Sequence, residues 1–182
     1  MFIKMLYLPI KIAGKVGFLL NKYFFTKIRS MHLQKTLKRC GPNLRVNSKS
    51  YFYGKKMIEL GENCNFNGIL IYGDGGLFIG NNFHSGKDCK IITVNHNFEG
   101  EKIPYDETEI KKPVKIGNNV WIGDNVIILP GTTIEEGVII GAGAVVRGGV
   151  EKYGIAVGNP AKVIKHRNKE HYEKLKQEKR FH

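Results

Sequence analysis

The chain has 182 residues, enough for one domain with short additions, and a formal net charge of +13. Its three cysteines are an odd number at irregular spacings, which argues against a disulfide scaffold or a cysteine-based metal site and favours a reducing cytosol. Lysines interrupt every apolar run well short of the roughly 20 residues that a transmembrane helix requires.

The excess positive charge belongs to the first third of the chain. Residues 1–58 contain thirteen Lys and Arg and no acidic residue, and Glu59 is the first acid. The rest of the chain is formally neutral. A strongly basic segment is typical of proteins that bind nucleic acid or an anionic membrane.

Residues 1–45 predict a basic amphipathic helical segment, whose helix opens near Pro9 and runs to about residue 38. On a helical wheel, a narrow basic stripe lies beside a broad apolar and aromatic face; the stripe comprises Lys4, Lys11, Lys15, Lys22 and Arg29. This pattern favours a helix that lies on an anionic membrane surface through residues 1–40. Packing against the chain's own core or another copy is the alternative. The broken apolar run argues against a signal peptide, and the large aliphatic surface argues against nucleic acid.

Residues 46–165 repeat with a period of six. An apolar β-branched residue leads each repeat after the midpoint, and a mostly small or β-branched residue follows it by four; the leading residues are Ile116, Ile122, Ile128, Ile134, Ile140 and Val146. This period fits neither an amphipathic helix nor a surface strand, and it is too short for a β-sandwich. It predicts an all-β core, a parallel β-helix of about four stacked coils. Cys64 and Cys89 fall on inward positions of this pattern.

Residues 97–112 interrupt the repeat and predict an extruded loop. The walls of a β-helix are flat, so a cleft has to come from such an excursion. His96 stands directly before the loop, and an imidazole can take a proton near neutral pH. His96 is therefore the candidate general base, with an exposed histidine of no catalytic role as the alternative. A backbone carbonyl, Glu99 or Asp106 could orient its ring. His84 is expected at a corner, two faces away from His96.

Residues 166–182 predict a charged, solvated helix that caps the open end of the prism. The preceding stretch, "IGNNVWIGDNVIILPGTTIEEGVIIGAGAVV" followed by "YGIAVGNPAKVIK", resembles the hexapeptide-repeat acyltransferases. It is most similar to galactoside, maltose and surface-polysaccharide sugar O-acetyltransferases. The resemblance spans residues 55–167 and implies a left-handed β-helix, a homotrimer with a cleft between subunits, and catalysis by His96.

The same resemblance implies the binding residues. Those for the coenzyme are Ala142, Arg147, Lys162, Lys165 and Trp121, and Arg147 stands where the family often has Thr-Lys. Asn67 and Asn95 are the candidates for binding the acceptor.

Together these features predict an O-acetyltransferase that transfers an acetyl group from acetyl-CoA to a sugar hydroxyl without a metal. The expected acceptor is a sugar or lipid-linked glycan in surface glycan or polysaccharide biosynthesis. The expected location is cytoplasmic and peripheral on the inner face of the membrane. The alternatives are an N-acetyltransferase of an amino sugar or antibiotic-type acceptor, and a non-catalytic trimeric assembly module. A metal-dependent hydratase of the same fold would need three histidines around one metal, but the repeat region holds only His84 and His96.

Overall fold

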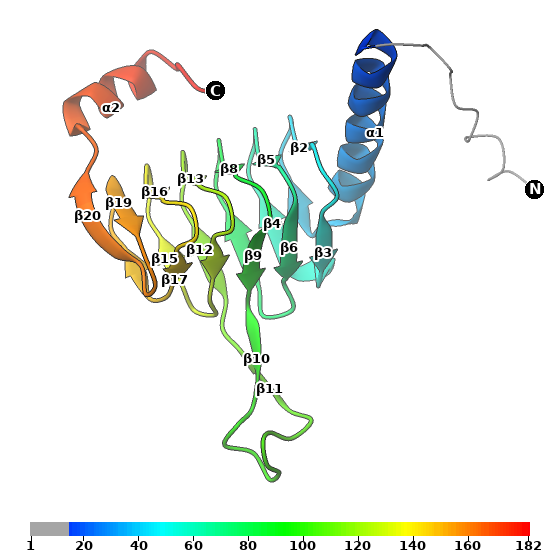
Figure 1. Ribbon diagram of the computed structural model, residues 1–182, viewed down its shortest axis with the longest axis vertical. Coiled ribbons are helices and arrows are strands. Elements are labelled where there is room, and N and C mark those ends of the chain that lie inside the picture. The colour runs from blue at the N-terminus through cyan, green and yellow to red at the C-terminus, as the bar shows by residue number, and fades with distance from the viewer. Residues whose placement is uncertain (1–14) are drawn as a thin grey trace, which may run out of the picture.

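The computed structural model describes residues 15–182, with side-chain surroundings from Tyr23 onward. The predicted helix start at Pro9 and the predicted basic residues Lys4 and Lys11 lie outside this range. Figure 1 shows a prism of stacked parallel strands, with helix α1 at its N-terminal end, helix α2 near its C-terminal end and one long arm. Successive strands along the chain belong to three different sheets in turn, which is the arrangement of a parallel β-helix.

Each sheet forms one face of the prism. Face 1 consists, in order, of β1 (Arg39–Cys40), β4 (Ile58–Leu60), β7 (Leu77–Ile79), β12 (Val114–Ile116), β15 (Thr133–Ile134) and β18 (Gly149–Val150). Face 2 consists of β2 (Arg45–Val46), β5 (Asn65–Phe66), β8 (His84–Ser85), β13 (Trp121–Ile122), β16 (Ile139–Ile140), β19 (Gly154–Val157) and β20 (Lys162–His166). Face 3 consists of β3 (Tyr51–Tyr53), β6 (Ile69–Tyr72), β9 (Cys89–Ile92), β14 (Ile127–Ile128) and β17 (Val145–Val146).

The predicted inward positions are confirmed. All leading residues of the six-residue repeat from residue 116 to residue 146 are buried, as are the residues four positions later. They stack in register through the coils, with Ile116 beside Ile134 on face 1 and Ile122 beside Ile140 on face 2. Cys64 and Cys89 are also buried, and burial raises the pKa of the Cys64 thiol to about 12. Both cysteines therefore act as small apolar core residues.

The prism is longer than predicted, since face 1 has six layers of strands where about four coils were expected. The additional coils lie at the N-terminal side, where Leu44, Val46 and Phe52 point into the core at uneven spacing. The helix was predicted to end at about residue 38, close to its observed end at Thr36. Strand β1 and the start of β2 complete the N-terminal segment of residues 1–45, and the sequence did not indicate them because the irregular early coils carry no clear six-residue rhythm.

Asparagines turn the corner between faces 1 and 2. Asn63, Asn82 and Asn119 adopt the left-handed backbone conformation with φ of 55°, 56° and 57°, which Asn tolerates better than most residues. Their amides form a ladder along the corner: Asn63 Nδ2 donates to Asn82 Oδ1 at 3.0 Å, and Asn82 Nδ2 donates to Asn119 Oδ1 at 2.8 Å. The ladder holds successive coils in register.

Helix α1 (Lys15–Thr36) closes the N-terminal end of the core. Leu33 and the following Leu37 pack into the core cluster. Arg29, a member of the predicted basic stripe, faces the body of the protein and donates to the carbonyl oxygens of Val46 and Asn47 at 3.2 and 3.1 Å. The opposite face of α1 exposes apolar side chains. No helix within residues 15–182 is long and apolar enough to cross a membrane.

Helix α2 (Lys169–Gln177) was predicted to cap the open end of the prism, but it lies beside the Asn ladder instead. It begins at Asn168, whose side chain accepts a hydrogen bond from the backbone N–H of His171. The buried Tyr172 accepts a hydrogen bond from Asn119 Nδ2 at 2.7 Å. The segment after α2 runs on toward earlier coils, where the His182 carbonyl accepts from Asn63 Nδ2 at 2.8 Å. Tyr172 therefore fastens α2 to the side of the prism.

Candidate active site

The arm leaves the prism between faces 3 and 1. Its stem is an antiparallel pair, β10 (Val94–His96) and β11 (Glu109–Lys111), in which His96 is opposite Glu109. The excursion was predicted to begin at residue 97, and it begins three residues earlier. The buried Thr93 anchors its base, because its hydroxyl donates to the Tyr72 carbonyl at 2.7 Å and accepts from the Gly75 N–H at 2.8 Å. A Cβ on Gly75 would meet the backbone carbonyl oxygen of Thr93 at 2.0 Å, so this close contact requires glycine.

The His96 side chain is exposed on the stem of the arm. Its ring stacks on Tyr105, which lies in the returning half of the arm, with ring centroids 3.9 Å apart and planes 11° from parallel. Neither ring nitrogen has a hydrogen-bond partner among the described residues. Tyr105 thus limits the orientation of the imidazole while both nitrogens remain accessible.

Asp106 does not orient His96, although the sequence left that possibility open. Its carboxylate accepts hydrogen bonds from the N–H and hydroxyl of Thr108 and from the N–H of Glu101. These bonds, led by the one from the Thr108 hydroxyl, hold the pKa of Asp106 below its usual value. Glu99 contributes only a backbone N–H, which donates to Asn97 Oδ1. Asp106 and Asn97 therefore shape the arm, and Tyr105 contacts the histidine.

The coenzyme candidates lie on the later coils. Ala142 is exposed at the corner between faces 2 and 3, where it stacks over Gly123; a Cβ on Gly123 would meet the Ala142 nitrogen at 2.7 Å. Lys162 and Lys165 are exposed on β20, at the last edge of face 2. Arg147 is exposed at the corner between faces 3 and 1. It therefore lies apart from the other candidates, at the corner from which the arm leaves on an earlier coil.

The acceptor candidates occupy two separate places. Asn67 lies at the corner between faces 2 and 3, where its Nδ2 donates to the Ser85 carbonyl at 2.7 Å and its Oδ1 accepts from Asn47 at 2.9 Å. These bonds give Asn67 a structural role in joining coils. Asn95 lies on the arm, where its Oδ1 accepts from the backbone N–H of His96 at 3.1 Å. One chain does not bring Asn67 and Asn95 together.

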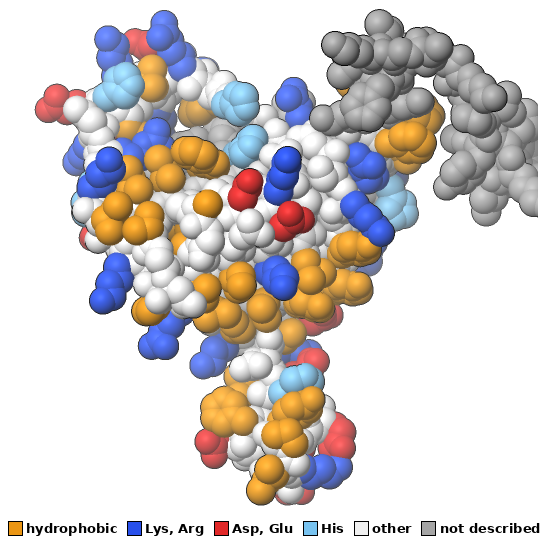
Figure 2. Space-filling view, viewed as in Figure 1, with side chains coloured by type: hydrophobic (Ala, Val, Ile, Leu, Met, Phe, Trp, Pro, Cys, Tyr) orange, Lys and Arg blue, Asp and Glu red, His pale blue; other side chains and the backbone are white. Residues whose placement is uncertain are grey.

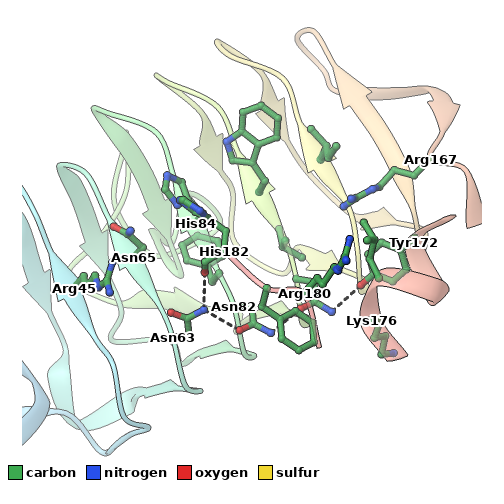
Figure 3. Close-up of a pocket in the computed structure, with 17 residues that line it drawn as sticks. Arg45, Asn63, Asn65, Asn82, His84, Arg167, Tyr172, Lys176, Arg180 and His182 are labelled. Atoms are coloured by element: carbon green, nitrogen blue, oxygen red, sulfur yellow. Dashed lines mark hydrogen bonds between the residues drawn. The ribbon is translucent and has the colours of Figure 1, made fainter. Parts of the chain in front are cut away.

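Face 2 carries a cavity of about 580 Å³ that the sequence did not predict. Outward side chains of successive strands form its floor. Helix α2 and the C-terminal tail, residues 178–182, form the opposite wall (Figure 3). Trp121, a coenzyme candidate, lies in the floor and is 53% exposed. We call this cavity the face-2 groove.

His84 also lies in the groove. It was expected at a corner, but it lies on strand β8 and points outward, because successive side chains of a strand alternate and the next residue, Ser85, is buried. Its Nε2 is 3.2 Å from Asn67 Nδ2, and its ring centroid is 5.6 Å from that of His182. Burial, followed by the nearby His182, lowers the pKa of His84. His84 and His96 lie on different sides of the prism, as predicted, because β8 belongs to face 2. Within residues 15–182, no three His, Cys, Asp or Glu side chains are grouped to hold a metal ion.

Comparison with known proteins identifies the family. Residues 113–148 match the family described as "Bacterial transferase hexapeptide (six repeats)". The structure of a maltose O-acetyltransferase from Clostridium difficile 630 is 30% identical, with a TM-score of 0.62, over 81% of this chain and 83% of that chain. The chain belongs to the hexapeptide-repeat acyltransferases.

A solved structure of a similar protein has the same fold. A galactoside acetyltransferase, solved in complex with coenzyme A, is 28% identical with a TM-score of 0.71, over 85% of this chain and 80% of that chain. The predicted left-handed parallel β-helix is thereby confirmed. A probable acetyltransferase of Mycobacterium tuberculosis (strain ATCC 25618 / H37Rv) is 40% identical over 125 residues, which are 68% of this chain. The match spans only 40% of that protein's length.

Two features of this hexapeptide-repeat chain could not be found from its sequence. Tyr105 is nine residues from His96, and only the fold of the arm brings their rings together. The C-terminal tail reaches Asn63, 119 positions earlier in the chain, and no sequence pattern indicates that contact. Asn65, His84 and Trp121 each stand directly before a buried inward residue of face 2, and this shared place in the repeat could have indicated a row of outward side chains.

Proposed function

We propose that this chain is an O-acetyltransferase that transfers an acetyl group from acetyl-CoA to a sugar hydroxyl in surface glycan or polysaccharide biosynthesis. The observation that carries the proposal is the position of His96. This chain presents it on an arm outside the prism, stacked on Tyr105 with both ring nitrogens accessible. The relatives with 28–30% identity are a galactoside acetyltransferase and a maltose O-acetyltransferase, which supports a sugar hydroxyl as acceptor.

In the proposed reaction, His96 is the general base. As the sugar hydroxyl attacks the thioester carbonyl of acetyl-CoA, its proton passes to the imidazole. The C–S bond then breaks, and the imidazolium returns the proton to the departing thiolate of CoA. Lys162 and Lys165 are the proposed contacts for the phosphates of the coenzyme, and their exposure at the last edge of face 2 supports this role. We further propose that Ala142 offers backbone groups to the pantetheine part of the coenzyme. Arg147 and Trp121 are additional candidates for binding the coenzyme.

Such a site requires more than one copy of the chain. The arm leaves between faces 3 and 1, whereas Ala142 lies between faces 2 and 3 and the lysines lie on face 2. We therefore propose a homotrimer with shared clefts, in which the arm of a neighbouring copy brings His96 to these residues. Exposed apolar side chains support this association: Ile103 on the arm is 100% exposed, and Tyr53 and Tyr72 stack on the outside of face 3. Figure 2 shows hydrophobic side chains along the body edge from which the arm leaves.

The proposed trimer predicts the mass of the protein in solution. Light scattering of the purified protein is expected to give three times the 20.6 kDa of one chain across working concentrations. Replacing Ile103 with Asp should weaken the trimer or its activity, because a charge would enter the apolar contact of the arm. Replacing Lys102 with Ala, a neighbouring exposed change, serves as the control. A stable monomer with full activity would contradict the shared site.

Acetyl transfer is tested by thiol release. Incubation with acetyl-CoA and a galactoside or maltose is expected to release free CoA and to form a product that hydroxylamine cleaves, since hydroxylamine cleaves esters much faster than amides. A hydroxylamine-resistant product from glucosamine alone would instead identify an N-acetyltransferase. Absence of thiol release with both classes of acceptor would leave the non-catalytic assembly module as the better account.

We also propose that the chain is cytoplasmic and binds the inner face of the membrane through its N-terminal segment, where it meets a lipid-linked acceptor. The exposed face of α1 carries Phe24, Ile28 and Met31, spaced by four and three residues so that they form one stripe. All three are between 40% and 49% exposed. The absence of acidic residues before Glu59 favours attraction to anionic lipids.

A further inference from the structure

The floor of the face-2 groove is a straight row of side chains. Arg45 is paired in register with Asn65, Asn65 with His84, and His84 with Trp121. Neighbouring parallel strands lie about 4.8 Å apart, so the four side chains follow one another along the prism like rungs. Figure 3 shows Arg45, Asn65 and His84 one after another along one side, His182 beside His84, and Arg180 farther along toward Tyr172.

The groove is lined by positive charge without a single acid. Its lining includes four Lys or Arg side chains and two histidines, and no Asp or Glu. The nearest carboxylates lie outside it: Glu136 pairs with Lys176, and Glu178 pairs with Arg180 at 3.0 Å in an exposed contact. Exposed pairs of this kind contribute little. The Arg45 guanidinium makes no hydrogen bond or ion pair with any described residue. The groove therefore presents to a ligand the Arg45 guanidinium without a partner, and that of Arg180 with only an exposed ion pair.

The same groove offers contacts that suit a sugar ring. The face of Trp121 is half exposed in the floor, and the apolar face of a pyranose packs well on an indole. Asn65 and Asn82 supply amide groups close by, and amides can both donate to and accept from hydroxyl groups. Apolar surface combined with a few well-placed polar groups is the usual composition of a small-molecule site.

We infer that the face-2 groove binds an anionic carbohydrate, a sugar that bears a phosphate or a carboxylate, with its charge on Arg45 and its ring toward Trp121, while Arg180 farther along the groove adds positive potential. The inference rests on the proposed function, for which it narrows the acceptor to charged sugars. Arg45 lies at the opposite end of face 2 from Lys162 and Lys165, the candidates for the phosphates of the coenzyme. An acceptor bound at Arg45 and a coenzyme bound at the two lysines would therefore occupy different parts of face 2.

Trp121 is the single tryptophan of the chain and lies in the groove, so its fluorescence reports binding there. Titration of the full-length protein with glucose 1-phosphate and with glucuronate is expected to give a saturable change, and neutral glucose a much weaker one. The stronger of the two anions identifies the charge that the groove prefers. Replacing Arg45 with Ala should weaken binding by about tenfold, the effect of losing one charge-assisted hydrogen bond. Arg180→Ala should weaken it less, because Arg180 is already paired with Glu178. Lys174→Ala removes an exposed lysine of α2 outside the groove and should change nothing.

Three results would overturn the inference. Equal affinity for glucose and the anionic sugars would show that the arginines do not bind the ligand. Equal affinity for inorganic phosphate and glucose 1-phosphate would remove the sugar from recognition. A change in oligomeric mass in Arg45→Ala or Arg180→Ala, without anion binding in the unsubstituted protein, would make the groove a contact between copies. Failure of the proposed function is separable, because it would appear as absent thiol release while sugar binding persists.

Discussion

Replacing His96 with Ala is expected to lower kcat for acetyl transfer by at least about 10²-fold, the low end for removal of a positioned general base. The affinity for acetyl-CoA should change little, because the proposed coenzyme contacts are made by other residues, on the later coils and β20. The exposed position of His96 on the stem of the arm makes a folding defect an unexpected outcome. Steady-state thiol release and an independent measurement of acetyl-CoA binding separate the two effects.

Two further variants test how His96 is held. Tyr105→Phe keeps the aromatic stack and should retain most activity, whereas Tyr105→Ala removes it and should lower kcat with less effect on KM. His171→Ala is the matched control, because His171 is an exposed histidine of α2 whose bond to Asn168 uses the backbone. Near-normal kcat in His96→Ala would exclude the histidine as the base.

The full-length protein is expected to cosediment with anionic vesicles and far less with neutral ones, and salt should weaken the binding. Replacing Phe24, Ile28 and Met31 together with Ser should abolish sedimentation. Full burial of such a side chain contributes roughly 1.5–3 kcal/mol, compared with about 1 kcal/mol for a basic residue near the surface. The three side chains are already exposed, so the variant should keep its thermal stability. Changing Lys11, Lys15 and Lys22 to Glu should weaken binding without abolishing the apolar contribution.

The structure also limits how the N-terminus can be shortened. Removal of residues 1–40 would take away Leu33 and Leu37, which close the core, and strand β1. Such a truncation is expected to destabilise the prism, by about 2–5 kcal/mol for each large core side chain lost. Removal of residues 1–22 leaves the packed half of α1 in place and is the proper test. Unchanged vesicle binding by the serine variant, or no binding by the full-length protein at low salt, would mean that α1 serves only to close the core.

The six-residue rhythm of the sequence was sufficient to predict the β-helix. Ile116, Ile122 and Ile128 point inward because each coil repeats the same backbone path, so equal spacing in the chain becomes equal position in space. The interruption after His96 likewise located the arm to within three residues, because a segment without inward apolar side chains cannot continue the coil. These are local properties, and a single sequence carries them.

Contacts between distant residues were decided only by the tertiary structure. The early coils lack a regular rhythm, so their place in the prism depends on stacking against later coils and on α1, and the number of coils was underestimated. Arg29 belongs to a basic stripe on the helical wheel, yet it faces the body because Val46 and Asn47 present free carbonyl oxygens there. The stack of Tyr105 on His96 and the closure of the face-2 groove by the C-terminal tail arise from chain paths that fold back. Their contact energies depend on geometry in space, which spacing along the chain does not specify.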